Sequence, residues 1–275
     1  MDEVAAPGRA LHLLAITCDI LSRPVYHFAS TSPHVVNVAH LSASLHAEPL
    51  TLRERIQEQI DAAGPGLDAV VLAYGLCGGA TAGIVARDVP VVLPRAHDCV
   101  TIFLGARDRY QAEHERTPGT YWYVQDQMDR GNDLKGWLLG DAARSDEVAA
   151  TRAGYVERFG AENADYLMAT LGEWSTRYER GAFLDTGLAP SDAAATRARE
   201  EAEQRGWRFE RKLADLQLVQ RLLYGQWNDD FQVLQPGERF AMSYDAGVVR
   251  AASDNSDSRP DLNASRNSTP KASTP

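Results

Sequence analysis

Short apolar runs recur through the first half of the chain, separated by segments whose apolar residues have helical spacing. Runs of five to seven residues rich in β-branched or aromatic side chains predict strands. They lie at Leu11–Thr17, Val35–Leu41, Ala69–Ala73, Val89–Leu93 and Thr120–Val124. The alternation of strands with helical segments predicts a parallel sheet covered on both faces.

The helices between these strands are predicted from spacing and from Gly and Pro residues. One apolar stripe has residues four apart, typical of a surface helix, and consists of Leu52, Ile56 and Ile60. Gly64-Pro65-Gly66 ends this helix. Two more helices are expected, from about Gly79 to Ala86 and from about Cys99 to Arg116. Pro24 argues against one continuous helix over Cys18–Ala29.

Beyond about Gly131 the apolar residues recur mainly at helical spacing. One predicted stripe consists of Val156, Phe159, Asn163, Leu167, Leu171, Trp174 and Tyr178, and a second of Leu213, Leu216, Val219, Leu223 and Trp227. Two final strands are expected at Phe231–Leu234 and Phe240–Tyr244. From about Ala246 to Pro275 the chain consists largely of small and polar residues, so it buries too little apolar surface to offset the entropy of ordering.

The pattern therefore predicts an α/β fold with a parallel-sheet, Rossmann-like three-layer core and a helical C-terminal half. A single α/β domain would span residues 10–245, and 275 residues suffice for a core of that size. Its expected parts are the sheet core at about 10–130, the helical part at about 131–230 and the final strands at about 231–245. A flexible N-terminus (1–9) and a disordered tail (246–275) would flank it.

The composition and net charge of the chain argue against some classes of binding partner. The chain has 28 Lys and Arg against 38 Asp and Glu, a formal net charge of −10, so neither nucleic acid nor an anionic membrane is an expected partner. No apolar stretch approaches the roughly 20 residues of a membrane span. The segment after Met1 lacks the positive flank and apolar core of a signal peptide, which favours a cytoplasmic protein. The sequence leaves open whether the chain forms a homo-oligomer.

The three cysteines of the chain stand at or shortly after predicted strand ends. Cys18 follows the first run, Cys77 the third and Cys99 the fourth. The carboxyl ends of parallel strands form the edge at which open α/β sheets bind ligands. An odd number of cysteines without an export signal favours metal binding or reactive thiols over a disulfide framework.

Four interpretations of this cluster stay open. The cysteines could hold zinc or an iron–sulfur cluster, with His97, His46 or His27 as an additional ligand. Gly75-Leu-Cys-Gly-Gly79 fits a nucleophile elbow centred on Cys77. A phosphate-binding loop could be built from Gly78, Gly79 and Gly83. In the fourth interpretation the glycines only turn the chain and the thiols are inert.

Polar residues near the cysteines supply the remaining candidates. Arg95 and Arg107 suit an anionic substrate, which Tyr74, Gly78 and Gly79 would also contact. His97 is a candidate proton carrier or fourth ligand. Asp98 could orient His97, or cap the helix that follows it, and capping is favoured.

Several motifs resemble the domain of unknown function 1638 family. They are Y-G-L-C-G-G (Tyr74–Gly79), P-R-A-H-D-C (Pro94–Cys99), F-L-G-A-R-D-R-Y (Phe103–Tyr110), P-G-T-Y-W-Y (Pro118–Tyr123), N-A-D-Y-L-M (Asn163–Met168) and V-L-Q-P-G (Val233–Gly237). The resemblance spans roughly Leu11 to Tyr244, and it implies that the three cysteines match those of the family. It also implies a link to corrinoid-dependent methyltransferase systems. At the first cysteine this chain has Thr17-Cys18-Asp19, whereas members of that family usually have Ala-Cys-Gly.

The expected function is that of a metal-dependent enzyme acting on a small anionic substrate, linked to one-carbon or corrinoid methyl-transfer metabolism. Cys18, Cys77 and Cys99 would hold an iron–sulfur cluster or zinc, and a corrinoid protein or methyltransferase would be a partner. The alternatives are a non-catalytic accessory protein that handles a metal or corrinoid, and a hydrolase or transferase with Cys77 as nucleophile.

Overall fold

The computed structural model describes residues 9–130, 152–157, 159–172, 177–243 and 247–253. Its larger sheet has five strands in the order β2-β1-β3-β4-β8. These strands are β1 (His12–Cys18), β2 (Val35–Leu41), β3 (Ala69–Ala73), β4 (Val91–Pro94) and β8 (Phe231–Leu234). The first four run parallel, and β8 is antiparallel to β4. Because β1, β3 and β4 are neighbours, the segments after them meet at one edge.

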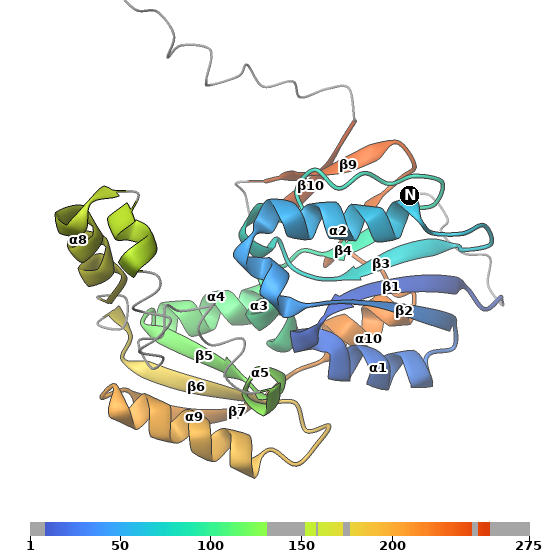
Figure 1. Ribbon diagram of the computed structural model, residues 1–275. Coiled ribbons are helices and arrows are strands. Elements are labelled where there is room, and N and C mark those ends of the chain that lie inside the picture. The colour runs from blue at the N-terminus through green and yellow to red at the C-terminus, as the bar shows by residue number, and fades with distance from the viewer. Residues whose placement is uncertain (1–8, 131–151, 158, 173–176, 244–246, 254–275) are drawn as a thin grey trace, which may run out of the picture.

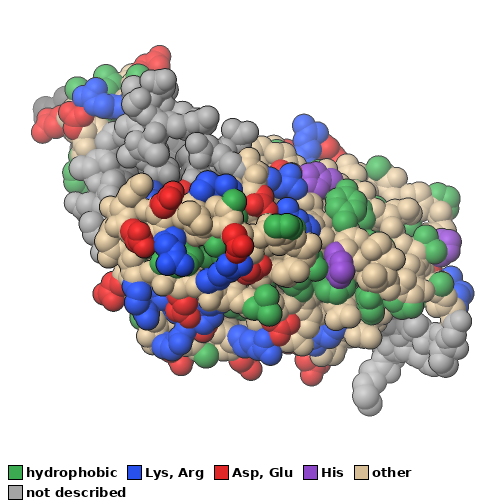
Figure 2. Space-filling model, turned by 90° about the horizontal axis from the view of Figure 1, so that it is seen from below, with side chains coloured by type: hydrophobic (Ala, Val, Ile, Leu, Met, Phe, Trp, Pro, Cys, Tyr) green, Lys and Arg blue, Asp and Glu red, His purple; other side chains and the backbone are tan. Residues whose placement is uncertain are grey.

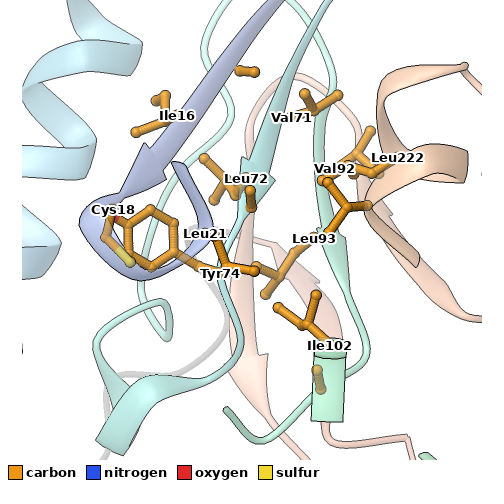
Figure 3. Packing of buried hydrophobic residues seen from close by; sticks show 14 of the residues in the cluster. Ile16, Cys18, Leu21, Val71, Leu72, Tyr74, Val92, Leu93, Ile102 and Leu222 are labelled. Atoms are coloured by element: carbon orange, nitrogen blue, oxygen red, sulfur yellow. The ribbon is translucent and has the colours of Figure 1, made fainter. Parts of the chain in front are cut away.

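Helices cover both faces of this sheet. Figure 1 shows α2 (Pro49–Asp61) on one face and α1 (Ser22–Thr31) with α10 (Gln217–Leu223) on the other. The predicted stripe of α2 is confirmed, since Leu52, Ile56 and Ile60 are all buried. Figure 3 shows the core between the layers, where β-strand residues pack against the helices. No helix in the described part of the chain combines the length and apolarity that a bilayer crossing requires.

A second sheet has three parallel strands in the order β5-β6-β7. They are β5 (Thr120–Val124), β6 (Arg180–Asp185) and β7 (Arg208–Leu213), accompanied by α4 (Arg107–Arg116), α5 (Gln125–Arg130) and α9 (Asp192–Gln204). Helix α8 (Ala161–Gly172) lies at the far left of Figure 1. An antiparallel pair, β9 (Glu238–Met242) with β10 (Val249–Ser253), lies beside the larger sheet.

A buried arginine joins α4 to the second sheet. The Arg180 guanidinium donates to Thr120 Oγ1 at 2.9 Å, to Glu210 Oε2 at 2.8 Å and to Glu113 Oε2 at 2.9 Å. Burial opposes ionisation of Glu113, but hydrogen bonds from Lys212, Arg116 and Arg180 outweigh it and lower its pKa to about 2. Figure 2 shows acidic and basic side chains interspersed across the described residues of one face.

The α/β class with parallel strands is confirmed, whereas the helical C-terminal half is not. Strands β6 and β7 lie within the segment predicted to be helical. Leu213 ends β7, so only Gln217–Leu223 of the second predicted stripe is helix. Gly181 explains how β6 packs here, because a Cβ at this position would be 2.8 Å from that of Ala202 in α9.

Two predicted helices are interrupted by glycines. In the segment predicted as a helix from Gly79 to Ala86, the end of the short 3₁₀ helix η3 (Cys77–Gly79) is followed by turns and by an isolated β-bridge at Val85. A helix does not form because Gly79 and Gly83 have φ of +90° and +92°. Gly105, with φ of +76°, divides the predicted Cys99–Arg116 helix into α3 (Cys99–Phe103) and α4. Such values are outside the helical region and favour glycine.

Of two smaller predictions, one is confirmed and one needed correction. Cys18–Ala29 is not one continuous helix, because a 3₁₀ turn at Asp19–Leu21 precedes α1, and Pro24 lies in the first turn of α1, where a missing backbone N–H costs little. The predicted tail begins too early, because residues 249–253 form β10. The rest of the tail and residues 1–8 lie outside the described residues.

Candidate functional site

The three cysteines begin the segments that follow three neighbouring strands. Cys18 ends β1 and is the N-cap of the 3₁₀ helix η1 (Asp19–Leu21). Cys77 opens η3 after β3, and Cys99 opens α3 after β4. They therefore lie at the same edge of the sheet, as the apolar runs before them predicted. Cys18 is 1% exposed, and the other two are partly buried.

The segments after β3 and β4 are held together by their backbones. Leu76 N donates to Ala96 O at 2.8 Å, and Cys77 N donates to His97 O at 2.9 Å. A Cβ on Gly75 would lie 2.7 Å from Asp98 N and 2.9 Å from Ala96 O. Only glycine fits there without moving one backbone, so Gly75 sets the distance between the Cys77 and Cys99 segments.

Burial and neighbouring charges oppose ionisation of all three thiols. Burial raises the pKa of Cys18 to about 11, even though backbone N–H groups of Ile20 and Leu21 act in the opposite direction. Burial also raises the pKa of Cys77, and the charge of Cys18 adds to that rise. The pKa of Cys99 is also raised, chiefly by burial and then by the charges of Asp98, Cys77 and Cys18. Cys18 thus opposes ionisation of Cys77 and Cys99, and Cys77 opposes ionisation of Cys99.

Carboxylates add to this effect. Asp19 contributes to the raised pKa of Cys18, and Asp98 contributes to the raised pKa of Cys77 and of Cys99. Asp19 is fixed by Ala43 N at 2.7 Å, His40 Nε2 at 3.1 Å and Arg130 Nη1 at 3.2 Å. A positive charge introduced among the thiols would therefore reverse the balance and favour thiolates.

A buried tyrosine lies against the cysteine cluster. Tyr74 follows β3, is 1% exposed, and lies beside Cys18 in Figure 3. Its hydroxyl has no hydrogen-bond partner in the described part of the chain. The His46 ring stacks on it with centroids 5.9 Å apart and an interplanar angle of 23°. Burial raises the pKa of Tyr74, with contributions from Cys18, Cys77 and Asp19, and burial lowers the pKa of His46.

Two of the residues predicted near the cysteines have structural roles. Asp98 Oδ1 accepts from Thr101 N at 3.0 Å and from Thr101 Oγ1 at 3.2 Å, so the capping interpretation is confirmed. Arg95 was expected to bind an anionic substrate. Its guanidinium instead donates to Gly247 O at 3.0 Å, to Val249 O and to Gln232 Oε1 at 2.7 Å, which joins β4 to β8 and β10.

The other predicted residues surround the cluster at varying exposure. The side chains of His97 and His27 are exposed. Arg107 is the first residue of α4, which follows the helix α3 that Cys99 begins. Gly78 and Gly79 have φ of +66° and +90°, and Arg53 donates to Gly79 O at 2.9 Å. Among the described residues, no three His, Cys, Asp or Glu side chains surround a common point as a metal ion requires.

Sequence reasoning missed a buried carboxyl at the start of α5, directly after the second sheet's strand β5. Asp126 follows β5, its side chain is 3% exposed, and Oδ1 lies 3.5 Å from Arg23 Nε of α1. Oδ2 has no hydrogen-bond partner among the described residues. Burial raises the pKa of Asp126 to about 6, although Arg23 and Arg130 act against the rise. Only its position after a strand could have indicated it.

Comparison with known proteins identifies a family but no individual relative. Residues 40–223, more than half of the chain, match the family described as "Protein of unknown function (DUF1638)". The matched range contains Cys77 and Cys99 and begins after Cys18. No curated protein and no solved structure matches the chain. The extent of the family match shows that the chain belongs to the DUF1638 family.

Proposed function

We propose that the chain is a cytoplasmic enzyme whose metal centre, zinc or an iron–sulfur cluster, is held by Cys18, Cys77 and Cys99. The observation that carries the proposal is the position of three thiols at or shortly after the ends of three neighbouring strands, close enough that the charge of Cys18 raises the pKa of both Cys77 and Cys99. We also retain a Rossmann-like three-layer arrangement for the larger sheet, which the helices on its two faces support. Thiols kept reduced suit the cytoplasm.

The donors fit a thiophilic metal in kind and number. Burial and the charges of Asp19 and Asp98 disfavour the thiolates, and a bound cation would offset this cost. Thiolates are preferred ligands of zinc and iron–sulfur clusters. Because the side chains do not surround a common point as placed, the ion must draw the thiols together. Metal binding would then be coupled to local ordering and to proton release.

The surrounding residues would stabilise the thiolates. Backbone N–H groups of Ile20 and Leu21 face the Cys18 sulfur, and that of Gly75 faces the Cys77 sulfur. Such donors favour the charged form of a thiol. The cap by Asp98 fixes the start of α3 and hence Cys99. These contacts would limit how far the ligands must move when an ion binds.

Three protein ligands would leave a coordination position for a small anionic substrate. Arg107 and the backbone N–H of Gly78 are the groups we assign to its charge, since the Gly79 N–H already donates to Leu76 O at 2.9 Å. Exposed His97 would carry protons to and from solvent. A bound zinc ion would polarise a substrate oxygen, and an iron–sulfur cluster would transfer electrons. The link to corrinoid or methyltransferase partners stays part of the proposal.

A second candidate function has its own supporting observation. Cys77 has φ of +47°, an uncommon value for a residue other than glycine, at a sharp turn after β3. Strained turns of this kind present the nucleophile in hydrolases with a nucleophile elbow. Against it, burial and neighbouring charges raise the pKa of Cys77 and thereby disfavour the reactive thiolate.

The test is the metal content and absorption spectrum of anaerobically purified protein. We expect one centre per chain, and loss of most of the metal in each of Cys18→Ser, Cys77→Ser and Cys99→Ser. His46→Gln and His97→Gln show whether a histidine is a ligand, and exposed His114→Gln is the matched control. Metal-free wild-type protein in which iodoacetamide labels Cys77 alone would favour the nucleophile instead. A centre retained in all three serine variants would contradict the proposal.

A further inference from the structure

Strand β2 forms one edge of the larger sheet, and its outer side has no neighbouring strand. In the order β2-β1-β3-β4-β8 it pairs only with β1. Val35 N donates to Leu11 O on the β1 side. Successive residues of a strand direct their backbone polar groups to alternate sides, so those of Val36, Val38 and His40 point outward. Within the described residues, no backbone group pairs with them.

The sequence of β2 lacks the features that usually keep an edge strand from pairing with another chain. Natural edge strands are short, bulged or covered, or they carry charged residues or Pro. β2 has seven residues in unbroken register with β1, V-V-N-V-A-H-L, with neither charge nor Pro, and none is fully buried. The edge strand β7 of the second sheet differs, since it reads R-F-E-R-K-L. β2 is therefore suited to adding a further strand.

The surface around this edge is uncharged. Positions 24–47, which hold most of α1, all of β2 and the 3₁₀ helix η2 (Ala43–Ala47), contain no Asp, Glu, Lys or Arg, although these make up 24% of the chain. On the side where α1 and β2 lie, Figure 2 shows mainly hydrophobic and His side chains, with the charged ones crowded on the other side. Copies of a chain with net charge −10 repel each other least where their surfaces are neutral. The charge distribution thus favours a second copy of this chain at the β2 edge.

An exposed aromatic side chain of α1 extends the same edge. Helix α1 lies over β1 and β2, whereas α10 lies over β3 and β4. Val25 of α1 is buried in the core, and the Phe28 ring contacts Tyr224 at the end of α10. Because an α-helix turns by about 100° per residue, Tyr26 projects on the side opposite Phe28, toward the free edge. Tyr26 is 51% exposed, so a strand added to β2 would bury part of its ring.

We propose that the β2 edge is a dimer interface, at which β2 of a second copy of this chain pairs antiparallel and joins the two larger sheets into one. A two-fold axis makes the pairing self-complementary, because each edge presents the same groups to the other. With the axis at Val38, Val36 of one copy lies opposite His40 of the other, and the outward backbone groups of all three are paired. The interface is independent of the metal centre, since no cysteine lies in β2. The competing occupant is an extended peptide of another protein.

Sedimentation velocity of the full chain over a concentration series measures dimerisation. We expect wild type to approach twice the 30.1 kDa of one chain. Asn37→Lys changes an exposed position of β2 and brings like charges together across the axis, so the dimer Kd should rise about tenfold or more. Leu213→Lys, at an exposed position of β7, is the matched control and should dimerise as wild type does. Equal dimerisation of Asn37→Lys and wild type overturns the inference, and a monomeric wild type overturns it in favour of the extended peptide.

Hydrogen exchange of wild-type protein locates the interface without any substitution. The amides of Val36, Val38 and His40 should exchange fast in dilute protein and more slowly as the protein concentration rises, because only the dimer pairs them. The amide of Val35, which is bonded to Leu11 O, should be equally protected at all concentrations. A dimer in which the three outward amides still exchange fast has its interface elsewhere and overturns the inference.

Discussion

Gly75 and Asp98 approach each other so closely that a Cβ on residue 75 would lie 2.7 Å from Asp98 N and 2.8 Å from Asp98 Cα. Both contacts are with backbone, which cannot rotate away. The approach brings the segment that carries Cys77 to the segment that carries Cys99. The geometry of the proposed site therefore depends on the absence of a side chain at residue 75.

Replacing this glycine should damage both stability and the site. We expect Gly75→Ala to lower the free energy of unfolding by about 3 kcal/mol, because one backbone segment must shift. Gly64→Ala is the control, since a Cβ there meets no atom within 4 Å. Urea unfolding and metal content measure the two effects. A Gly75→Ala protein as stable and as metal-loaded as Gly64→Ala would contradict the described contact.

Arg95 should matter for stability rather than for substrate. Arg95→Met removes donors to Gly247 O, Val249 O and Gln232 Oε1 and leaves these acceptors partly unpaired, so we expect a loss of about 2–3 kcal/mol. Arg55→Met, which removes one exposed pair with Glu58, should change the melting temperature little. Unfolding curves with metal content give the comparison. Unchanged stability in Arg95→Met would return Arg95 to the substrate-binding candidates.

Strand β10 should contribute to stability although the sequence around it reads as a tail. Val249–Ser253 pairs with Met242–Glu238, and Val249 O accepts from Arg95. A chain truncated after residue 246 should therefore melt several degrees below a chain truncated after residue 253. Differential scanning calorimetry of the two truncations measures this. Identical melting temperatures would show that β10 adds nothing to the fold.

Asp126 should make stability depend on pH. Its pKa is raised by burial to about 6, against about 3.9 for an unfolded Asp, so the folded chain binds the proton more tightly. The carboxyl therefore destabilises the fold increasingly as pH rises from about 4 to about 6, and by a constant amount above that. We expect Asp126→Asn to gain about 2 kcal/mol relative to wild type between pH 4 and pH 7.

Urea unfolding at several pH values measures the gain, with Asp129→Asn as the control. Asp129 pairs with the same Arg23 but is 27% exposed. A stability difference between Asp126→Asn and wild type that stays constant from pH 4 to pH 7 would show that the Asp126 carboxyl is not buried as described.

Local patterns predicted much of the fold. Val35–Leu41, Ala69–Ala73 and Thr120–Val124 are strands with the predicted bounds, because β-branched or aromatic runs are strong local signals. The local signal fails where backbone geometry or tertiary packing determines where a helix ends or a strand forms. Gly105 ends α3 by adopting a positive φ, and β6 forms where Gly181 admits α9 at close range. Neither requirement is visible in hydrophobic spacing.

The candidate site was predictable only in part. Strand ends placed the three cysteines at one edge, since parallel strands share a direction. The use of Arg95 by the backbone of residues 247 and 249, about 150 positions away, could not be read from the sequence. The same holds for the unpaired oxygens of Tyr74 and Asp126, because burial and hydrogen bonding depend on distant segments.

X-ray absorption spectroscopy at the edge of the metal found in anaerobically purified protein tests the central claim most directly. The account predicts about three sulfur ligands near 2.3 Å for zinc, and sulfur lost from the first shell in any of Cys18→Ser, Cys77→Ser and Cys99→Ser that retains metal. An iron–sulfur cluster would add sulfide and iron neighbours to the same cysteine dependence. A metal without sulfur ligands, or a sulfur shell unchanged in any of the three serine variants, would contradict the shared three-cysteine centre.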